Sequence, residues 1–175
     1  LRILLMRITD NLIKDIANAP DWFFDAINIE PSECVIKNPK GNLSYSKWNS
    51  DSENKNLLIL IHGTGAHKRW WYPIAPHFTK NANVIAVDLP GMGDSGFREK
   101  YSIKDFGQCI ISIIEKEKSD MLIDNVFIVG HSLGGQVAAY VASEEKELVS
   151  SLIMIDTFIR PPDWDPCLLY TSDAA

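Results

Sequence analysis

Runs of apolar residues recur along the chain from residue 57 onward. A run of about four to eight apolar residues bounded by turn residues is typical of a strand buried on both faces of a sheet. Three such runs and a longer, mostly apolar stretch predict strands at Leu57–Ile61, Val84–Val87, Val126–Val129 and Leu148–Ile155.

The stretches between these runs have helical periodicity. In Arg69–Lys80, Trp70, Ile74 and Phe78 are four apart, which predicts a helix that begins near Pro73, because proline suits a first turn. Further helices are predicted at Ser102–Lys118, with Ser102 as N-cap, and at Leu133–Glu145. Apolar strands that alternate with helices predict an α/β fold, with a mostly parallel sheet covered on both faces.

The region before residue 57 has a different pattern. Apolar residues in Asn11–Ile27 have roughly helical spacing interrupted by Pro20, which predicts two short amphipathic helices. Polar and apolar residues alternate in Glu33–Lys37 and Leu43–Trp48, with turn residues between them. This pattern predicts an N-terminal β-hairpin.

Three regions follow from these patterns: an N-terminal helical extension (1–28), an α/β core (29–160) and a terminal region (161–175). Leu1–Leu5 precede Met6, which begins a plausible start, M-R-I-T-D-N-L. Cys167–Ala175 resembles a translated sequencing adapter. We therefore expect the native chain to continue beyond Pro166 with other residues.

Charge and composition limit the classes of binding partner and the cellular location that we expect. The formal net charge of −6 disfavours nucleic acid and anionic membrane surfaces. No apolar run approaches the roughly 20 residues of a membrane span, and the N-terminus has no signal-peptide pattern. The cysteines at 34, 109 and 167 have neither metal nor disulfide spacing, so a reducing cytoplasm is the default location.

The main candidate for a catalytic site is Gly130-His131-Ser132-Leu133-Gly134, called the elbow below. It matches G-x-S-x-G between a predicted strand and a predicted helix. This spacing predicts a sharp turn with a positive φ at Ser132. Gly130 and Gly134 must be small because the turn brings them close to each other and to neighbouring strands. The alternative is that Ser132 is only a helix N-cap.

Three motifs in this order resemble the α/β-hydrolase superfamily: H-G-T-G at 62–65, D-L-P-G-M-G-D-S at 88–95 and G-H-S-L-G-G at 130–135. With the hairpin, the resemblance covers about residues 33 to 160, and it implies that the core holds about six of eight strands. It also implies that residues 161–175 are the start of a lid, unless they are a non-native tail. It implies that Ser132 is the nucleophile. It also implies that the backbone N–H groups of Thr64 and Leu133 form the oxyanion hole.

The resemblance also implies a triad histidine after the acid, yet no histidine follows His131. We expect structural roles for His62 and His131, packed or solvated roles for His67 and His77, and a catalytic base beyond the end of this sequence. Asp156 stands where some hydrolase families place the acid, whereas most place it one strand later.

Three other residues near these motifs need an interpretation. Asp94 is expected to stabilise its turn by bonding backbone N–H groups. One of Trp70 and Trp71 could form a wall of the acyl pocket, or both belong to the core. The sequence shows no metal cluster and no phosphate-binding G-x-x-x-x-G-K.

The resulting hypothesis is a cofactor-free serine hydrolase that acts through an acyl-enzyme on a small carboxylic ester. Carbon–carbon bond hydrolases, thioesterases and acyltransferases use the same elbow and stay open, as does a non-catalytic ligand receptor or scaffold of this fold. Haloalkane dehalogenases and epoxide hydrolases are disfavoured because they need a carboxylate at the position of Ser132. The 175-residue chain itself is expected to be inactive and poorly stable.

Overall fold

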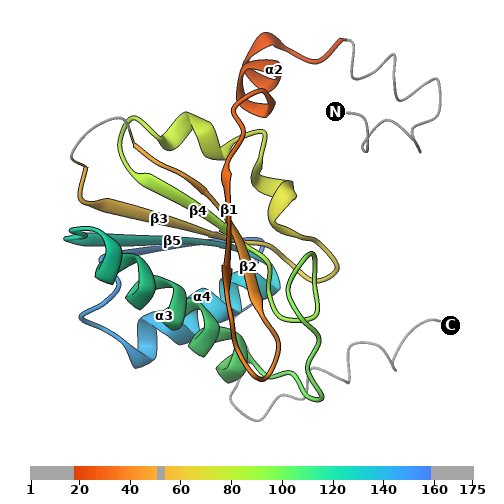
Figure 1. Ribbon diagram of the computed structural model, residues 1–175, viewed down its shortest axis with the longest axis vertical. Helices are drawn as coiled ribbons and strands as arrows, with labels where there is room; N and C mark the ends of the chain where they lie inside the picture. Colours follow the sequence, from red (N-terminus) through yellow and green to blue (C-terminus); the bar gives the residue numbers. More distant parts are fainter. Residues whose placement is uncertain (1–17, 51–53, 159–175) are drawn as a thin grey trace, which may run out of the picture.

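A six-stranded, mostly parallel sheet forms the centre of the molecule (Figure 1). The computed structural model describes residues 18–50 and 54–158. The strand order is β1-β2-β4-β3-β5-β6. The strands are β1 (Ser32–Ile36), β2 (Leu43–Trp48), β3 (Asn56–Ile61), β4 (Asn83–Val87), β5 (Asn125–His131) and β6 (Ser151–Ile155).

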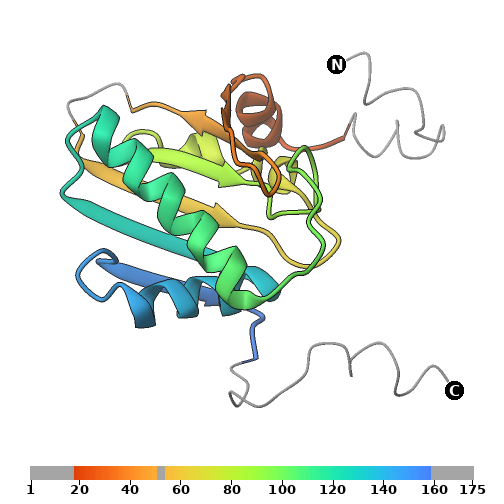
Figure 2. The same ribbon diagram turned by 60° about the horizontal axis from the view of Figure 1, so that its bottom comes forward.

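The two halves of the sheet differ in strand direction. β1 pairs antiparallel with β2, and β2 pairs antiparallel with β4, so the predicted hairpin is confirmed. β4, β3, β5 and β6 pair in parallel. Figure 2 shows the parallel strands ending on one side, where the loops that follow β3 and β4 also lie. The carboxyl ends of parallel strands are where α/β proteins place their sites.

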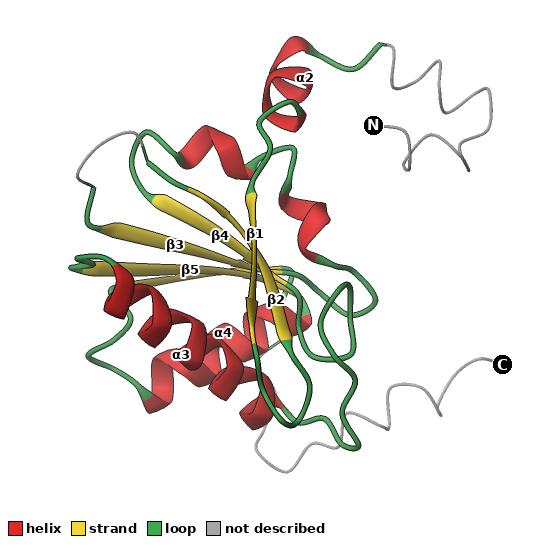
Figure 3. Cartoon of the chain, viewed as in Figure 1, coloured by secondary structure: helices red, strands yellow, loops and turns green. Residues whose placement is uncertain are grey.

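Two long helices cover one face of the sheet, as Figure 3 shows. They are α3 (Ile103–Asp120), which Ser102 caps at its N-terminus, and α4 (Leu133–Glu144). Their apolar faces pack on alternate residues of the central strands, including Ile59, Ile85 and Ile128. This packing forms the larger core, and it confirms the two helices that the periodicity predicted.

The opposite face is covered by short elements. The helix predicted within Arg69–Lys80 is wrong: two short 3₁₀ segments, η2 (Lys68–Trp71) and η3 (Ala75–Phe78), take its place. Pro73 and Pro76 lack the N–H that a continuous α-helix requires, which explains the break. α2 (Asp21–Ile27) lies beside η3, and the helix predicted before it lies outside the described residues.

The prediction that the four apolar runs form strands buried on both faces is wrong for β5 and β6. Trp71, Ala75 and Ala82 pack on β3 and β4, whereas Phe127 and Val129 of β5 are only half-buried on this face. An apolar hollow of about 470 Å³ lies there. The last strand also begins at Ser151, not at Leu148, and its Ile153 and Ile155 are exposed.

Candidate active site

The turn between β5 and α4 is strained at its central residue. Ser132 has φ +51° and ψ −116°, the positive φ that the G-x-S-x-G spacing predicts. Its side chain makes no capping hydrogen bond with α4, so the N-cap alternative lacks its defining contact. Its backbone N–H donates to Ile155 O at 2.9 Å, and its carbonyl accepts from Gly135 N at 3.0 Å. The turn is therefore held by β6 and by the first turn of α4.

Gly130 and Gly134 leave no room for a side chain. A Cβ at 130 would overlap the carbonyl of Gly134, and a Cβ at 134 would lie 2.6 Å from His62 O and overlap Ile61 O. All these obstacles are backbone atoms, which cannot rotate away as side chains can. The close approach brings the elbow directly against the end of β3.

The loop of residues 62–67, called the H-G-T-G loop below, lies against the elbow. A Cβ on Gly63 would be 2.8 Å from His131 Nδ1 and 3.2 Å from Ser132 Cβ. The next residue, Thr64, is exposed. Within the described residues, the backbone N–H groups of Thr64 and Leu133 have no hydrogen-bond acceptor. Two unpaired N–H donors beside a hydroxyl are the arrangement that an oxyanion requires.

His62 fixes the start of this loop. Its ring is fully buried, Nε2 accepts from Leu89 N at 3.1 Å, and Nδ1 lies 2.7 Å from Gly63 O. Since Nε2 accepts a hydrogen bond, Nδ1 must carry the ring's hydrogen and donate it to Gly63 O. Burial lowers the pKa of His62, although the Gly63 carbonyl and Asp88 oppose this effect. The ring is therefore neutral, and both its nitrogens are occupied.

The bond to Gly63 O also orients Thr64. The Gly63 carbonyl and the Thr64 N–H belong to one planar peptide unit and point in opposite directions. Gly63 O also accepts from Ala66 N at 3.2 Å, which closes a turn. Holding the carbonyl at two points leaves the Thr64 N–H directed away from it.

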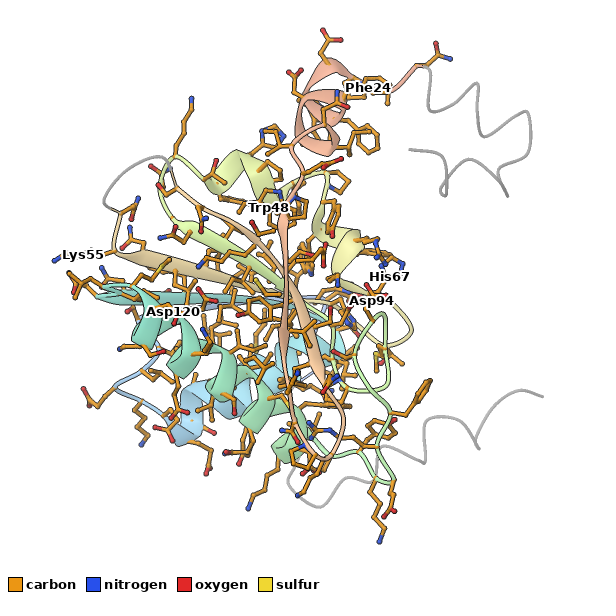
Figure 4. The ribbon with its side chains drawn as sticks, in the orientation of Figure 1. Phe24, Trp48, Lys55, His67, Asp94 and Asp120 are labelled. Atoms are coloured by element: carbon orange, nitrogen blue, oxygen red, sulfur yellow. The ribbon has the colours of Figure 1, made fainter. Side chains whose placement is uncertain are left out.

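The other histidines occupy different surroundings. The His131 ring stacks on Trp70, with 5.8 Å between ring centroids and an interplanar angle of 14°. Trp70 is 59% exposed beside the elbow, whereas Trp71 is buried in the core. His77 is exposed, and its Nε2 lies 3.2 Å from Trp22 O. His67 is exposed near Asp94 at the carboxyl end of the sheet (Figure 4).

Asp88 has the role that the sequence prediction gave to Asp94. The buried Asp88 carboxylate accepts from Asp94 N at 2.8 Å and from Lys68 N at 2.6 Å. Asp94 instead forms ion pairs with Lys68 and Arg69, both at 2.9 Å. The prediction for Asp94 is wrong because the buried carboxylate at the end of β4, not the exposed one, lies inside the turn.

Lys68 is a feature that the sequence reasoning missed. Its side chain is only 1% exposed, and Nζ lies 2.8 Å from Glu33 Oε2 and 2.6 Å from Ser44 Oγ. Burial alone would lower the pKa of Lys68, but the Glu33 and Asp94 carboxylates raise it above its ordinary value. The only signal in the sequence is a lysine soon after H-G-T-G, which by itself suggests an exposed side chain.

Asp156 ends β6 beside the elbow. It has φ +47°, and its exposed carboxylate makes no hydrogen bond to any described residue. Its neighbour Thr157 donates to Ser132 O at 3.2 Å. The backbone after β6 thus contacts the elbow, while the role of the Asp156 carboxylate as triad acid stays a prediction.

In the described parts of the chain, 18–50 and 54–158, no group of three or more His, Cys, Asp and Glu residues could hold a metal ion. Likewise, none of the helices there has the length and apolar character needed to cross a membrane.

Comparison with known proteins gives a consistent result. The sequence profile of the family described as alpha/beta hydrolase fold matches residues 56–172. A pimeloyl-[acyl-carrier protein] methyl ester esterase from Pseudoalteromonas atlantica is 34% identical over 120 residues, which are 64% of this chain and 43% of the relative. The chain therefore spans less than half the length of this relative.

Solved structures share the fold. The thioesterase domain from the curacin biosynthetic pathway aligns with a TM-score of 0.66 at 22% identity, over 81% of this chain and 51% of that one. A hydrolase from Pseudomonas aeruginosa PA01 aligns with a TM-score of 0.65 at 20% identity, over 74% and 48%. At this identity, the likeness shows the fold alone.

Proposed function

Because the chain belongs to the α/β-hydrolase fold family, we propose that it is part of a serine esterase whose nucleophile is Ser132. The observation that carries this proposal is the elbow itself. Ser132 has φ +51° and lies beside two unpaired backbone N–H donors, those of Thr64 and Leu133, in the described part of the chain. A Ser132 with only a structural role would not need this strained backbone.

In the proposed reaction, Ser132 Oγ attacks the ester carbonyl carbon, and a histidine takes the hydroxyl proton. The carbonyl oxygen becomes an oxyanion that accepts hydrogen bonds from Thr64 N and Leu133 N. Collapse of this intermediate expels the alcohol, which receives the proton. Water then attacks the acyl-enzyme, releases the carboxylic acid and restores Ser132.

In this scheme, neither His62 nor His131 supplies the base. Both nitrogens of His62 are engaged by backbone groups, and His131 is stacked on Trp70. We propose that the base lies beyond the end of this sequence, together with the acid unless Asp156 supplies it. The 175-residue chain alone should then not turn over esters.

A small carboxylic ester is the proposed substrate class. The relatives named as methyl ester esterases, at up to 34% identity in the alignments above, support an ester. The free thiols of Cys34 and Cys109 support a reducing compartment such as the cytoplasm. Trp70, exposed beside the elbow, is positioned to contact an acyl or alcohol group.

The test uses the whole protein with a fluorophosphonate probe, which forms a covalent bond with an activated serine. We expect labelling at Ser132 and hydrolysis of short p-nitrophenyl esters, both lost in Ser132→Ala. Ser143→Ala is a matched control, because Ser143 lies at the other end of α4 and hydrogen-bonds Tyr140 O. Absence of labelling on the folded whole protein would instead support a non-catalytic receptor or scaffold.

A further inference from the structure

We propose that Lys68 is a positioning residue for the oxyanion hole, acting through the H-G-T-G loop. This inference rests on the proposed function, because it concerns the same site. Lys68 directly follows the loop, at the start of η2. Its buried ammonium group joins the H-G-T-G loop to the N-terminal hairpin and to the Gly-rich loop of residues 88–96 that follows β4.

The contacts of Lys68 reach three separate segments. Nζ lies 2.8 Å from Glu33 of β1, 2.6 Å from Ser44 of β2, and 2.9 Å from Asp94 in the Gly-rich loop. The Asp88 carboxylate lies 3.4 Å from the same ammonium group and also accepts the backbone N–H of Lys68 at 2.6 Å. Both the side chain and the backbone of Lys68 are therefore fixed.

The hairpin residues in this network are themselves constrained. Glu33 Oε1 accepts from Ser46 Oγ at 2.8 Å and from Tyr72 Oη at 2.7 Å. Ser44 N donates to Ser95 Oγ at 2.9 Å. Lys68 is thus held by groups that have their own fixed partners, which makes the network stiff.

The H-G-T-G loop depends on Lys68 because the residues in the middle of the loop make few packing contacts. Thr64 and Gly65 are exposed, and no atom would meet a Cβ on Gly65 within 4 Å. The loop is consequently held at its two ends, by His62 at the start and by Lys68 at the finish. Displacing either end moves the peptide unit that carries the Thr64 N–H.

The network does not act on the oxyanion by its charge. One ammonium group faces the carboxylates of Glu33, Asp88 and Asp94, so the cluster has no positive excess to stabilise an anion. Its effect must be geometric. The Thr64 N–H binds the oxyanion most strongly in the transition state. Misplacing this N–H should therefore raise the activation barrier and change the substrate affinity little.

Two variants test this in the whole protein: Lys68→Met, which removes the ammonium group, and Glu33→Gln, which weakens one contact at a half-exposed carboxylate. We expect kcat for ester hydrolysis to fall about tenfold or more, a part of the loss seen when an oxyanion donor is removed. KM should stay within about twofold, since ground-state binding is unchanged. Affinity for a boronic acid, which mimics the tetrahedral intermediate, should fall with kcat.

Arg69→Ala is the matched control. Arg69 pairs with the same Asp94 carboxylate but is 46% exposed and, among the described residues, forms no hydrogen bond or ion pair with the hairpin. Its kcat should match the unchanged protein. A kcat that stays normal in folded Lys68→Met or Glu33→Gln, or a rise in KM alone, would overturn the inference.

A second measurement does not depend on catalysis. In ¹⁵N NMR spectra, Lys68→Met and Glu33→Gln should both shift the Thr64 amide resonance, and Arg69→Ala should not. An unmoved Thr64 amide in both variants would contradict the positioning role. If Lys68→Met fails to fold, Glu33→Gln decides alone. If the fluorophosphonate probe does not label Ser132 in the unchanged protein, the esterase proposal is refuted. The NMR test of Lys68 stays valid in that case.

Discussion

At the scale of single residues, the elbow can form only because Gly130 and Gly134 have no side chains. Gly134 faces the carbonyls of Ile61 and His62 so closely that even one added methyl group overlaps them. Because these carbonyls lie at the last residue of β3 and directly after it, at the centre of the sheet, they cannot move without disturbing the strands on either side.

Gly134→Ala should therefore destabilise the fold by about 3 kcal/mol, the upper part of the usual range for overpacking. Urea unfolding followed by circular dichroism measures the change. Gly65→Ala is the comparison: Gly65 has φ +71° but open space around it, so only the backbone strain of about 1 kcal/mol is expected. Equal losses in the two variants would show that close approach is not the cause.

The sequence predicted the elbow well and its surroundings less well. The positive φ of Ser132 follows from the spacing of Gly130 and Gly134, which is a local property. The burial of Lys68 is not local, since it depends on carboxylates 35 residues before it and 26 residues after it, at Glu33 and Asp94. Local sequence patterns do not indicate that charged residues so far apart in the chain form ion pairs.

At the scale of elements, the structure joins the hairpin to the loops at the carboxyl ends of β3 and β4. Burial would raise the pKa of Glu33, but hydrogen bonds from Lys68, Tyr72 and Ser46 lower it below its ordinary value. The Lys68 ammonium group also lowers the pKa of Asp94. The pKa of Lys68 is raised by the same pairs.

These shifts predict how stability depends on pH. Carboxyls with lowered pKa contribute stability above their unfolded values, near 4, and lose it as the pH falls through their folded pKa. Lys68 contributes fully below its unfolded pKa of about 10.5 and loses this contribution as the pH rises through its raised value. Thermal unfolding should show a plateau around neutral pH that falls off at both ends.

Lys68→Met should flatten both limbs of this pH profile relative to the unchanged chain. Lys116→Met is the control, because Lys116 forms an exposed pair with Asp120 on the surface of α3. If the two variants have the same profile, the buried network does not set the pH dependence.

The failure of the predicted helix at Arg69–Lys80 also belongs to this scale. The spacing of Trp70, Ile74 and Phe78 suggested one helical face, yet all three are exposed to a substantial degree. Trp71 and Ala75, which lie off that face, are the residues that pack on β3 and β4. Periodicity identifies apolar residues that would share one face of an α-helix. It does not show which residues face the sheet when the segment forms short 3₁₀ turns instead.

At the scale of the whole molecule, one face of the sheet is covered by helices and the other face is covered only in part. α3 and α4 cover the first, whereas η2 and η3 cover β3 and β4 but leave β5 and β6 lining the apolar hollow. β6 is an edge strand with Ile153, Met154 and Ile155 exposed. Exposed apolar edges favour association between chains.

Ile153→Lys should therefore keep the 175-residue chain monomeric to higher concentration, with little change in stability. Ile153 is 57% exposed, so the substitution removes no core contact that is fully buried. Light scattering and size-exclusion chromatography measure the association. Leu152→Lys is the control, because Leu152 packs against the core under α4 and its loss should lower Tm. Unchanged association in Ile153→Lys would exclude this edge as the cause.

The stack of Trp70 on His131 gives the molecule a built-in optical reporter. Indole emission responds to a ring in direct contact, and this contact lies one residue from Ser132, with 5.8 Å between the ring centroids. A molecule that enters beside the elbow must displace the indole or cover it, so its arrival should change the tryptophan emission. The difference between the unchanged chain and Trp70→Phe isolates this signal from the other four tryptophans. Occupancy of the site could thus be followed before any bond is broken.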